Sequence, residues 1–458
     1  MKRHNPQSGF AVLYATMLIL GITLAMVGPL SLLSLSSQKM TRKAAASNQA
    51  LFAAESGIED ATYRIKNLLP YSSNYTISVG DSQASLQVTS NGNQRTVTVE
   101  GAKENATRKL QLDLEISTIT PQFFFGAQVG EGGLKMEENS RIEGIGGTVG
   151  NVYTNGPVEG DNNATITGDA VVAPGVSPSS LEDVVVEGTA KADSIKKSEI
   201  CGDAYYQTID GSSTNFLNNP SAICPSPVTP GTGFGGQASP PSQPMPISQE
   251  DIDQWKADAA AGGTIAGNCG DSGAAECVIG DNDTLLLGPK KVTGSLTLTK
   301  KQTLVVTGTL HLQGFLSMDS GSGATIKCSP SYGQNSCAVI TDGWVHVKNN
   351  SMFQGSGTAG SYILILSTLQ NCRGGNQQPE CTHHNAAIDI HNNATGAVFY
   401  TRDSLANIHN GVTVTEITAY QLSIDNNSTI QYEQGLANAQ FSSGPGAGFE
   451  VTSWKEIE

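Results

Sequence analysis

Apolar side chains fill the start of the chain without interruption. From Phe10 to Ser37 no residue is charged, and basic residues flank the run on both sides. An apolar segment of this length can cross a bilayer as a single helix. Gly28 and Pro29 within it predict a kink or a melted turn. Cleavage as a secretory signal is the alternative, although such signals normally have a shorter apolar core.

The apolar pattern then becomes periodic. Apolar residues recur at three- and four-residue spacing at Leu51, Ala54, Ile58, Ala61, Ile65 and Leu68. Polar residues, among them Glu55 and Glu59, occupy the opposite side. This spacing predicts an amphipathic continuation of the same helix. We therefore expect one helix from Phe10 to about Leu69, which Pro70 ends.

Residues 74–117 alternate between apolar and polar side chains in four short runs. These runs are YTISV, ASLQV, RTVTVEG and KLQLDLEI, with turn residues between them. A period of two predicts strands with one apolar face. The amphipathic segment 46–69 supplies a cover for that face. We expect a helix packed on a four-stranded antiparallel sheet.

A short motif recurs in the C-terminal two thirds. Its clear copies begin at Val345 (VHVKNNSM), Ile388 (IDIHNNAT), Asn407 (NIHNGVT) and Leu422 (LSIDNNST), and looser ones begin at Leu296 and Leu316 and lie near Asp161. Each has an apolar–polar–apolar triplet before an Asn pair or Asn-Gly, and the last three are spaced by about 16 to 18 residues. This repeat predicts a β-solenoid (β-helix) with trimmed turns, and a jelly roll or sandwich is the alternative.

The asparagines of the motif predict its corners. Asn tolerates the left-handed backbone that a sharp corner needs, and stacked amides can form ladders between coils. The predicted turn residues are Asn349, Asn350, Asn392, Asn393, Asn410, Asn426 and Asn427.

Eight cysteines all lie beyond residue 200 and fall in close pairs. The expected disulfides join Cys201 to Cys224, Cys269 to Cys277, Cys328 to Cys337 and Cys372 to Cys381. Such local pairs indicate an oxidising compartment and loops pinned to the solenoid. Free buried thiols are the alternative, and Cys372, Cys381, His383 and His384 could instead mimic a zinc site.

Composition limits the classes of function. The chain has 51 glycines, is only 6% aromatic and carries a net charge of −15. Such a composition suits short strands and tight turns, and the negative charge argues against a nucleic-acid partner.

No arrangement of residues in the sequence indicates catalysis, so we expect no enzyme activity, no catalytic residues, no cofactor and no metal. His391 and His409 are expected to stack on the solenoid wall. Asp389 and Asp425 are expected to point outward at matching repeat positions, where they would be solvated. The acidic loop 280–284 leaves calcium binding open.

Two further segments break the solenoid pattern. Residues 218–246 are rich in Pro, Gly and Ser, and SQEDIDQWKADAAA follows as a short helix with Ser248 as its N-cap. Ile252 and Trp255 are expected to dock this helix on a solenoid end. At the C-terminus, Phe449 and Trp454 are expected to cover the last coil.

The N-terminal features together resemble the class III signal of type IV pilins. A short basic leader ends at Gly9, and Phe10 begins the apolar helix; the resemblance implies cleavage between these two residues by a prepilin peptidase. Pilins usually carry a glutamate at the fifth mature position, where this chain has Tyr14. PilX-type pilus assembly proteins and pseudopilins often lack this glutamate, and they carry a segment similar to NQALFAAESGIEDA after the membrane helix. In both respects the chain resembles them. The resemblance covers about the first 120 residues.

These observations predict a mainly β protein with a long N-terminal α-helix. The expected segments are a leader (1–9), a transmembrane or filament-core helix (10–37), a pilin-like helix and sheet (38–120), a first part of the solenoid (121–217), a Pro-rich loop and short helix (218–262), and a main solenoid with its cap (263–458).

The resemblance implies a single-pass membrane protein at the cell surface or in a pilus, with an extracytoplasmic domain. It would assemble with other pilin-like subunits through the N-terminal helix, and the solenoid would act in adhesion or filament-tip assembly on a surface or polysaccharide ligand. The alternatives are a membrane-tethered solenoid without a filament and a carbohydrate-active β-helix enzyme.

Overall fold

A computed structural model describes residues 8–66, 72–91, 94–116, 118–119, 121, 123–175, 177, 179–210, 215–216, 232–320, 323–373, 381, 385–442 and 449–457. The chain divides into two compact units. The first comprises Met1–Ile65, Leu69–Glu115 and Glu450–Glu458, and the second comprises Lys66–Leu68 and Ile116–Phe449. Because the second unit lies between two pieces of the first, it is an insertion in the chain of the first unit.

Helix α1 (Ser8–Lys66) is the predicted long N-terminal helix. The prediction of a melted turn at Gly28 and Pro29 is wrong, because the helix is continuous through Pro29. A proline removes a single backbone hydrogen bond, and the flanking Leu and Met residues are strong helix formers. One lost bond is therefore tolerated within a helix of this length.

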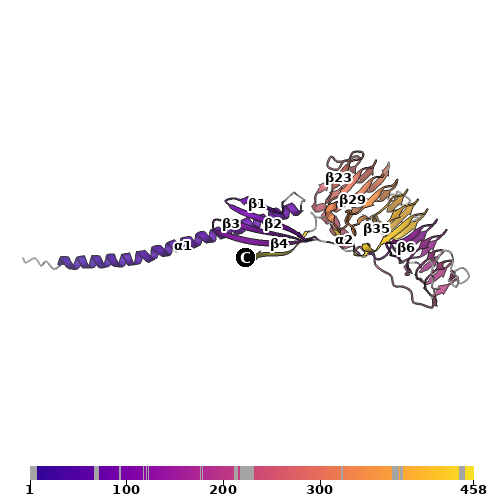
Figure 1. The fold of residues 1–458 in the computed structure, drawn as a ribbon, viewed down its shortest axis with the longest axis horizontal. Helices are drawn as coiled ribbons and strands as arrows, with labels where there is room; N and C mark the ends of the chain where they lie inside the picture. Colours follow the sequence, from indigo (N-terminus) through magenta and orange to yellow (C-terminus); the bar gives the residue numbers. More distant parts are fainter. Residues whose placement is uncertain are drawn as a thin grey trace, which may run out of the picture. The chain divides into compact units, whose positions relative to one another are not determined.

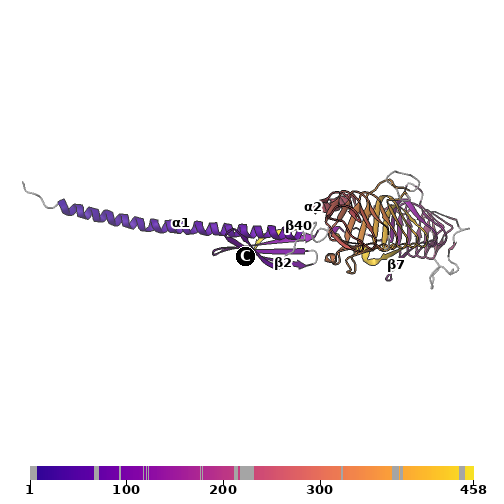
Figure 2. The ribbon, with the colours of Figure 1, turned by 90° about the horizontal axis from the view of Figure 1, so that it is seen from above.

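The sheet of the first unit has five strands and not the predicted four. Its order is β1 (Asn74–Val79), β2 (Ser82–Asn91), β3 (Gln94–Lys103), β4 (Ala106–Ile116) and β40 (Phe449–Ile457). The first four pair antiparallel in sequence order. Figure 2 shows α1 along one face of this sheet.

The C-terminal strand β40 was expected to cap the solenoid, and that expectation is wrong. Arg108 lies 2.9 Å from Glu456, and Thr452 donates to the carbonyl of Asp113 at 3.1 Å. As the residue number rises along β4 from Arg108 to Asp113, the number of the partner on β40 falls from Glu456 to Thr452. Strand β40 is therefore antiparallel to β4. Trp454 belongs to the first unit and is 55% exposed, so it is not buried as a capping residue of the solenoid would be. Strand β4 would otherwise present an open edge of unpaired backbone groups, which β40 satisfies.

Small residues let the helix approach the sheet closely. Ala50, Ala53 and Ala54 are fully buried. A Cβ on Gly101 would lie 1.9 Å from the carbonyl oxygen of Ala50, and one on Gly57 would lie 2.6 Å from Cγ1 of Val99. The helix backbone therefore contacts the sheet backbone, with no room for larger side chains between them.

The second unit is the predicted β-solenoid. Strands β24 (Lys290–Val292), β25 (Leu296–Thr299) and β26 (Thr303–Val306) form one coil, and each pairs in parallel with β27 (Leu310–Leu312), β28 (Leu316–Ser320) or β29 (Thr325–Cys328) of the next. Each coil thus has three faces, which we call face A, face B and face C in chain order.

The strands are assigned to faces by these parallel pairings. On face A lie β21 (Thr264–Ile265), β24, β27, β30 (Cys337–Thr341), β33 (Ile363–Ser367), β8 (Val152–Thr154), β11 (Ala170–Val172), β14 (Ala190–Lys191), β17 (Ala204–Tyr206) and β20 (Gly233–Gly235). On face B lie β22 (Cys269–Gly270), β25, β28, β31 (Val345–Val347), β34 (Ile388–His391), β9 (Val158–Gly160), β12 (Ser180–Glu182), β15 (Ser194–Lys196) and β18 (Thr208–Ile209). On face C lie β23 (Thr284–Leu287), β26, β29, β32 (Met352–Gln354), β36 (Thr413–Val414), β38 (Thr429–Glu433), β7 (Arg141–Ile145), β10 (Thr165–Ile166), β13 (Val185–Val186), β16 (Glu199–Ile200) and β19 (Asn215–Phe216).

Three long strands continue from face A to face B through the corner. They are β6 (Ala127–Met136), β35 (Val398–His409) and β37 (Glu416–Ile424). The pairing of β35 with β37 shifts register at that corner, between Thr401 and Leu405. At these corners the strand itself continues from one face to the next.

The two solenoid segments of the sequence form one stack in a permuted order. Strand β37 pairs in parallel with β6, so Ile417 lies beside Ala127 and Leu422 beside Leu134. The chain therefore starts in the middle of the stack at β6 and runs to β20. It then begins again at the opposite end with β21 and returns to β6. Figure 1 shows β6 next to the C-terminal coils around β35.

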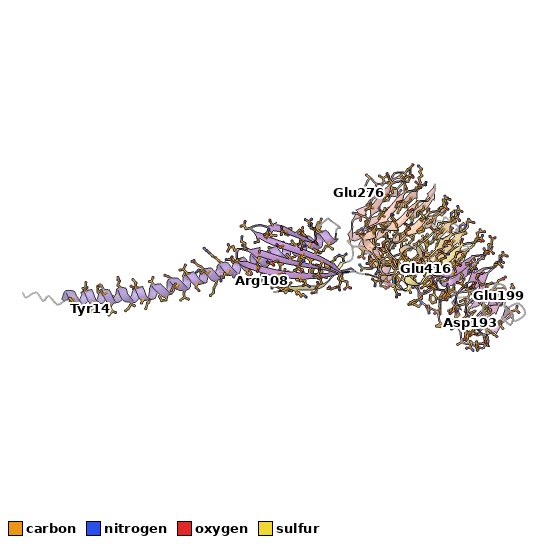
Figure 3. The ribbon with its side chains drawn as sticks, in the orientation of Figure 1. Tyr14, Arg108, Asp193, Glu199, Glu276 and Glu416 are labelled. Atoms are coloured by element: carbon orange, nitrogen blue, oxygen red, sulfur yellow. A yellow bond between two sulfur atoms is a disulfide. The ribbon has the colours of Figure 1, made fainter. Side chains whose placement is uncertain are left out.

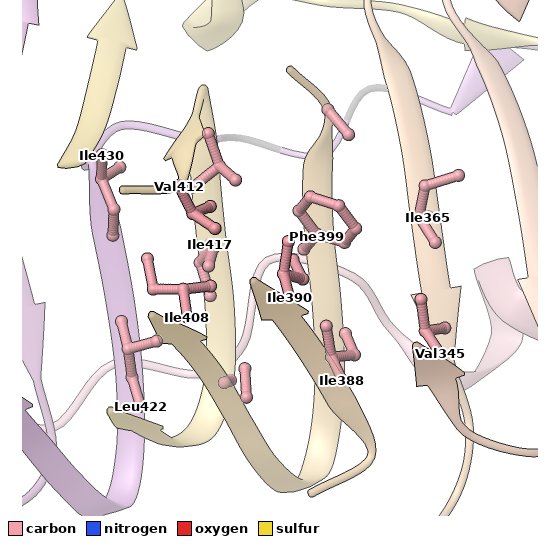
Figure 4. Packing of buried hydrophobic residues seen from close by; sticks show 14 of the residues in the cluster. Val345, Ile365, Ile388, Ile390, Phe399, Ile408, Val412, Ile417, Leu422 and Ile430 are labelled. Atoms are coloured by element: carbon pink, nitrogen blue, oxygen red, sulfur yellow. The ribbon is translucent and has the colours of Figure 1, made fainter. Parts of the chain in front are cut away.

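Inward side chains stack from coil to coil as the repeat predicted. Ile388, Ile390, Ile408 and Leu422 are all fully buried and lie in neighbouring coils (Figure 4). Burying each such side chain contributes roughly 1.5–3 kcal/mol. The stack is therefore the main source of stability in this unit.

Helix α2 (Gln249–Ala261) begins at the predicted N-cap, where Ser248 and Asp251 form a capping box. Its Ile252 and Trp255 are buried, but on the outer surface of face A and not on a solenoid end. The reason is that outward side chains of face A, such as Ile340 and Leu364, are apolar and need a cover. Small elements complete the unit: β5 (Thr118–Ile119) paired with β39 (Phe441–Ser442), and the short helices η1 (Pro330–Tyr332) and η2 (Gln434–Asn438).

Candidate functional site

The N-terminal half of α1 has an apolar surface on all sides. Every large apolar side chain from Phe10 to Leu35 is exposed, with exposed fractions between 47% for Ile22 and 73% for Leu24. The helix is long and apolar enough to cross a membrane. A helix that is apolar all round is stable only in lipid or among other helices. We call residues 10–37 the bare segment.

The bare segment begins at the predicted processing site. Gly9 and Phe10 both lie in the first turn of α1. The ring of Tyr14 lies 5.9 Å from the ring of Phe10, and Tyr14 is 67% exposed (Figure 3). Tyr14 thus presents a neutral phenol where pilins usually carry a carboxylate, and a neutral group enters an apolar surrounding at a lower free-energy cost.

Three of the four expected disulfides are present within the described residues. Cys269 is bonded to Cys277, Cys328 to Cys337 and Cys372 to Cys381. Cys201 is also disulfide-bonded, and its expected partner Cys224 lies outside the described residues. A disulfide at Cys372 and Cys381 removes the thiolates that the alternative zinc site would need. His383 and His384 lie outside the described residues.

The predicted asparagines form the corner between faces B and C. All seven, from Asn349 to Asn427, have positive φ angles between 51° and 64°. Asn392 donates to the Asn349 side chain at 3.4 Å, and Asn139 donates to Asn427 at 3.4 Å. The amide ladder therefore continues from the last coil into the first.

Histidines and an aspartate gather on the outer surface of face B. The rings of His391 and His409 stack at 4.9 Å with an interplanar angle of 11°, as expected from the repeat. His346 also stacks on His391, at 5.1 Å. Burial lowers the pKa of His391, and the charge of Asp389 opposes this only in part. The neutral imidazole is therefore favoured at this position.

The environment of Asp389 was predicted incorrectly. Its side chain is 1% exposed and is not solvated. His409 Nε2 and Asn407 Nδ2 each lie 3.2 Å from its Oδ1. Asp425 does not share its register, because Asp389 pairs with Asn407 and Asn407 with Ser423. The motifs IDIH and NIH place His391 and His409 at outward positions, which predicted their stacking, but they do not show which side chains of neighbouring coils bury Asp389.

A second carboxylate, that of Asp342, links helix α2 to face A. Asp342 accepts from Lys256 Nζ at 2.7 Å and lies 2.9 Å from His311 Nε2. Burial alone would raise the pKa of Asp342, but the hydrogen bonds and charges of His311 and Lys256 outweigh burial and lower it. By contrast, Asp281 in the loop considered for calcium forms an exposed ion pair with Lys300 at 3.2 Å.

An aromatic groove lies on the outer surface of face A. It has a volume of about 560 Å³ and is lined by residues that include Tyr153, Lys191, Tyr205 and Pro240. Tyr205 stacks on Phe234 at 4.9 Å, and Lys191 Nζ lies 5.2 Å from the Tyr205 ring. The lining therefore combines aromatic and polar side chains, as is typical of ligand sites.

No protein-family model and no curated protein sequence matches the chain. Among solved structures, the crystal structure of the competence-associated pilin ComZ from Thermus thermophilus is similar over 90% of this chain and 97% of that chain. The sequence identity is 13% and the TM-score is 0.25. Because a TM-score of this size does not establish a shared fold, the fold described above rests on the strand pairings of this chain.

Proposed function

We propose that the chain is a type IV pilin-like subunit of the minor-pilin or pseudopilin kind. Its bare segment would lie in the membrane and then in the core of a filament, beside the helices of other pilin-like subunits. The observation that carries this proposal is α1 itself. One half has an apolar surface on every side, and the other half packs on an antiparallel sheet.

The start of the helix supports processing at Gly9–Phe10. Removal of the basic leader would place the apolar Phe10 at the mature N-terminus. Tyr14 favours a PilX-type or tip position over that of a major subunit, because it lacks the carboxylate that pairs with a neighbouring N-terminal amine. The size of the insertion between β4 and β40 also favours a sparse or terminal position, since it would crowd every turn of a fibre.

We propose that the solenoid is displayed outside the cell for recognition and not for catalysis. The disulfides suit an oxidising compartment. The aromatic groove beside Tyr205 is a candidate site for a surface polysaccharide. The second candidate function is a membrane-tethered solenoid with no filament, which Tyr14 favours because a tether needs no subunit pairing.

Cross-linking from the bare segment distinguishes these two functions. A photoreactive amino acid would replace Leu24, which is 73% exposed, in the producing cells. The matched control would carry the same group at Glu276, on the solenoid surface (Figure 3). Filament assembly predicts that Leu24 adducts contain proteins with a pilin-type N-terminal helix and that Glu276 adducts do not. Adducts of Leu24 with lipid alone would contradict filament assembly.

A further inference from the structure

Three side chains from two neighbouring coils converge on the outer surface of face B. His346 comes from β31, and Asp389 and His391 come from β34, with His346 directly opposite Asp389 in the parallel pairing. Each offers one ligand atom, and these atoms lie within 4.8 Å of one another. The strand backbones fix these positions, because neighbouring strands are held about 4.8 Å apart by their hydrogen bonds.

We propose that His346, Asp389 and His391 bind one divalent transition-metal cation, of which Zn²⁺ is the model. Two imidazole nitrogens and one carboxylate oxygen form a donor set that suits Zn²⁺ and its neighbours in the first transition row. Ca²⁺ and Mg²⁺ prefer oxygen ligands throughout. The fourth position would be open to solvent, because His391 is only half-buried.

The distances fit a cation after a small adjustment. His346 Nε2 lies 2.9 Å from His391 Nε2 and 3.7 Å from Asp389 Oδ2. Two nitrogens about 2.0–2.1 Å from a tetrahedral zinc ion are about 3.3 Å apart. The two rings would therefore separate by roughly 0.4 Å, which side-chain rotation can supply without moving the strands.

Neighbouring side chains already hold the carboxylate in a suitable orientation. His409 Nε2 and Asn407 Nδ2 both lie 3.2 Å from Asp389 Oδ1. Asn410 Nδ2 lies 3.1 Å from Nδ1 of His409. When Asn410 donates to that nitrogen, the His409 proton lies on Nε2 and is donated to Asp389. The other oxygen, Oδ2, is then directed toward His346, and such supporting hydrogen bonds are typical of metal sites.

Burial gives a further reason for a cation. The Asp389 side chain is 1% exposed and that of His346 is 6% exposed. A buried carboxylate is costly unless a positive charge compensates it. A divalent cation would add to the hydrogen bonds that stabilise this carboxylate, and it would also join the coils of β31 and β34, between which the loop carrying Cys372 and Cys381 is inserted.

The test is cobalt binding by the tag-free, full-length chain in detergent after EDTA treatment. We expect one equivalent of Co²⁺ to produce the visible absorption of a nitrogen- and oxygen-liganded ion, and Zn²⁺ to abolish it by displacement. His346→Ala and Asp389→Asn should each weaken binding at least ~100-fold, and His409→Gln should weaken it by about 10- to 100-fold.

The matched control is His311→Gln, which alters another buried histidine paired with an aspartate on the solenoid wall. It should leave cobalt affinity unchanged. Hydrogen exchange of β33 and β35 without metal would establish that each variant is folded, and His391→Gln, at a half-buried position, would replace any variant that is not. A native chain with no saturable cobalt spectrum, or affinity retained within ~3-fold in the folded His346 and Asp389 variants, would leave only a metal-free stacked ladder and overturn the proposal.

Discussion

The contact between α1 and the sheet gives the sharpest prediction about stability. A Cβ on Gly101 would lie 1.9 Å from Ala50 O and 2.7 Å from Ala54 N. Ordinary close contacts between carbon and oxygen are about 3.3–3.6 Å, so Gly101→Ala requires the helix to move away by roughly 1.4 Å or more. Overpacking of this kind costs about 1–3 kcal/mol.

Hydrogen exchange of the full-length chain in detergent measures this effect locally. A loss of about 1–3 kcal/mol corresponds to amide exchange about 5- to 150-fold faster, which we expect in β3 and in residues 46–58. Amides of β33 in the solenoid should be unchanged. The matched control is Ala102→Ser, which enlarges the next residue on the opposite side of the strand. Equal protection in Gly101→Ala, Ala102→Ser and the native chain would refute the close helix–sheet contact.

Three further predictions concern the solenoid and the last strand. Burial raises the pKa of Glu416 well above its usual range, and the hydrogen bond from Thr418 opposes this only in part. The folded unit therefore holds the proton of Glu416 more tightly than the unfolded chain does. As a result, the folded unit loses stability as pH rises from about 4.3 through the folded pKa. Glu416→Gln should therefore raise the melting temperature by an amount that grows with pH across this window, and a pH-independent difference would contradict it. Trp255→Ala should cost about 3–5 kcal/mol and free α2, seen as rapid proteolysis at residues 236–262 while the coils remain folded. Deletion of 450–458 should speed hydrogen exchange in β4 and leave β1 unchanged, whereas equal protection of β4 would show that β40 contributes nothing to the sheet.

Local sequence patterns were enough to predict much of the fold. The apolar run from Phe10, the period-two runs of residues 74–117 and the Asn pairs at 349–350, 392–393 and 426–427 each report short-range geometry. Each was enough to predict a helix, a strand or a corner, because the side-chain pattern repeats with the backbone. The same logic placed Ser248 at the start of α2.

Partners distant in the sequence could not be predicted in this way. Strand β40 alternates between apolar and polar residues like any edge strand, but nothing in its residues indicates that β4 is its neighbour. Likewise Ile417 lies beside Ala127, and a parallel pairing has no hairpin turn from which it could be predicted. The burial of Asp389 was missed for a related reason. Its neighbours His346 and Asn407 come from separate coils, and repeat alignment alone assigned it to solvent.

We propose that this chain is matured and used as a pilin-like subunit, so the position of its mature N-terminus is decisive. The most direct measurement is the mass of the N-terminal peptide of the protein purified from its native membrane. We expect a chain that starts at Phe10, with the basic leader removed and the apolar helix intact. A chain that starts at Met1 would contradict the claim and leave a tethered solenoid, and a start near Ser37 would mean that the bare segment is a cleaved signal.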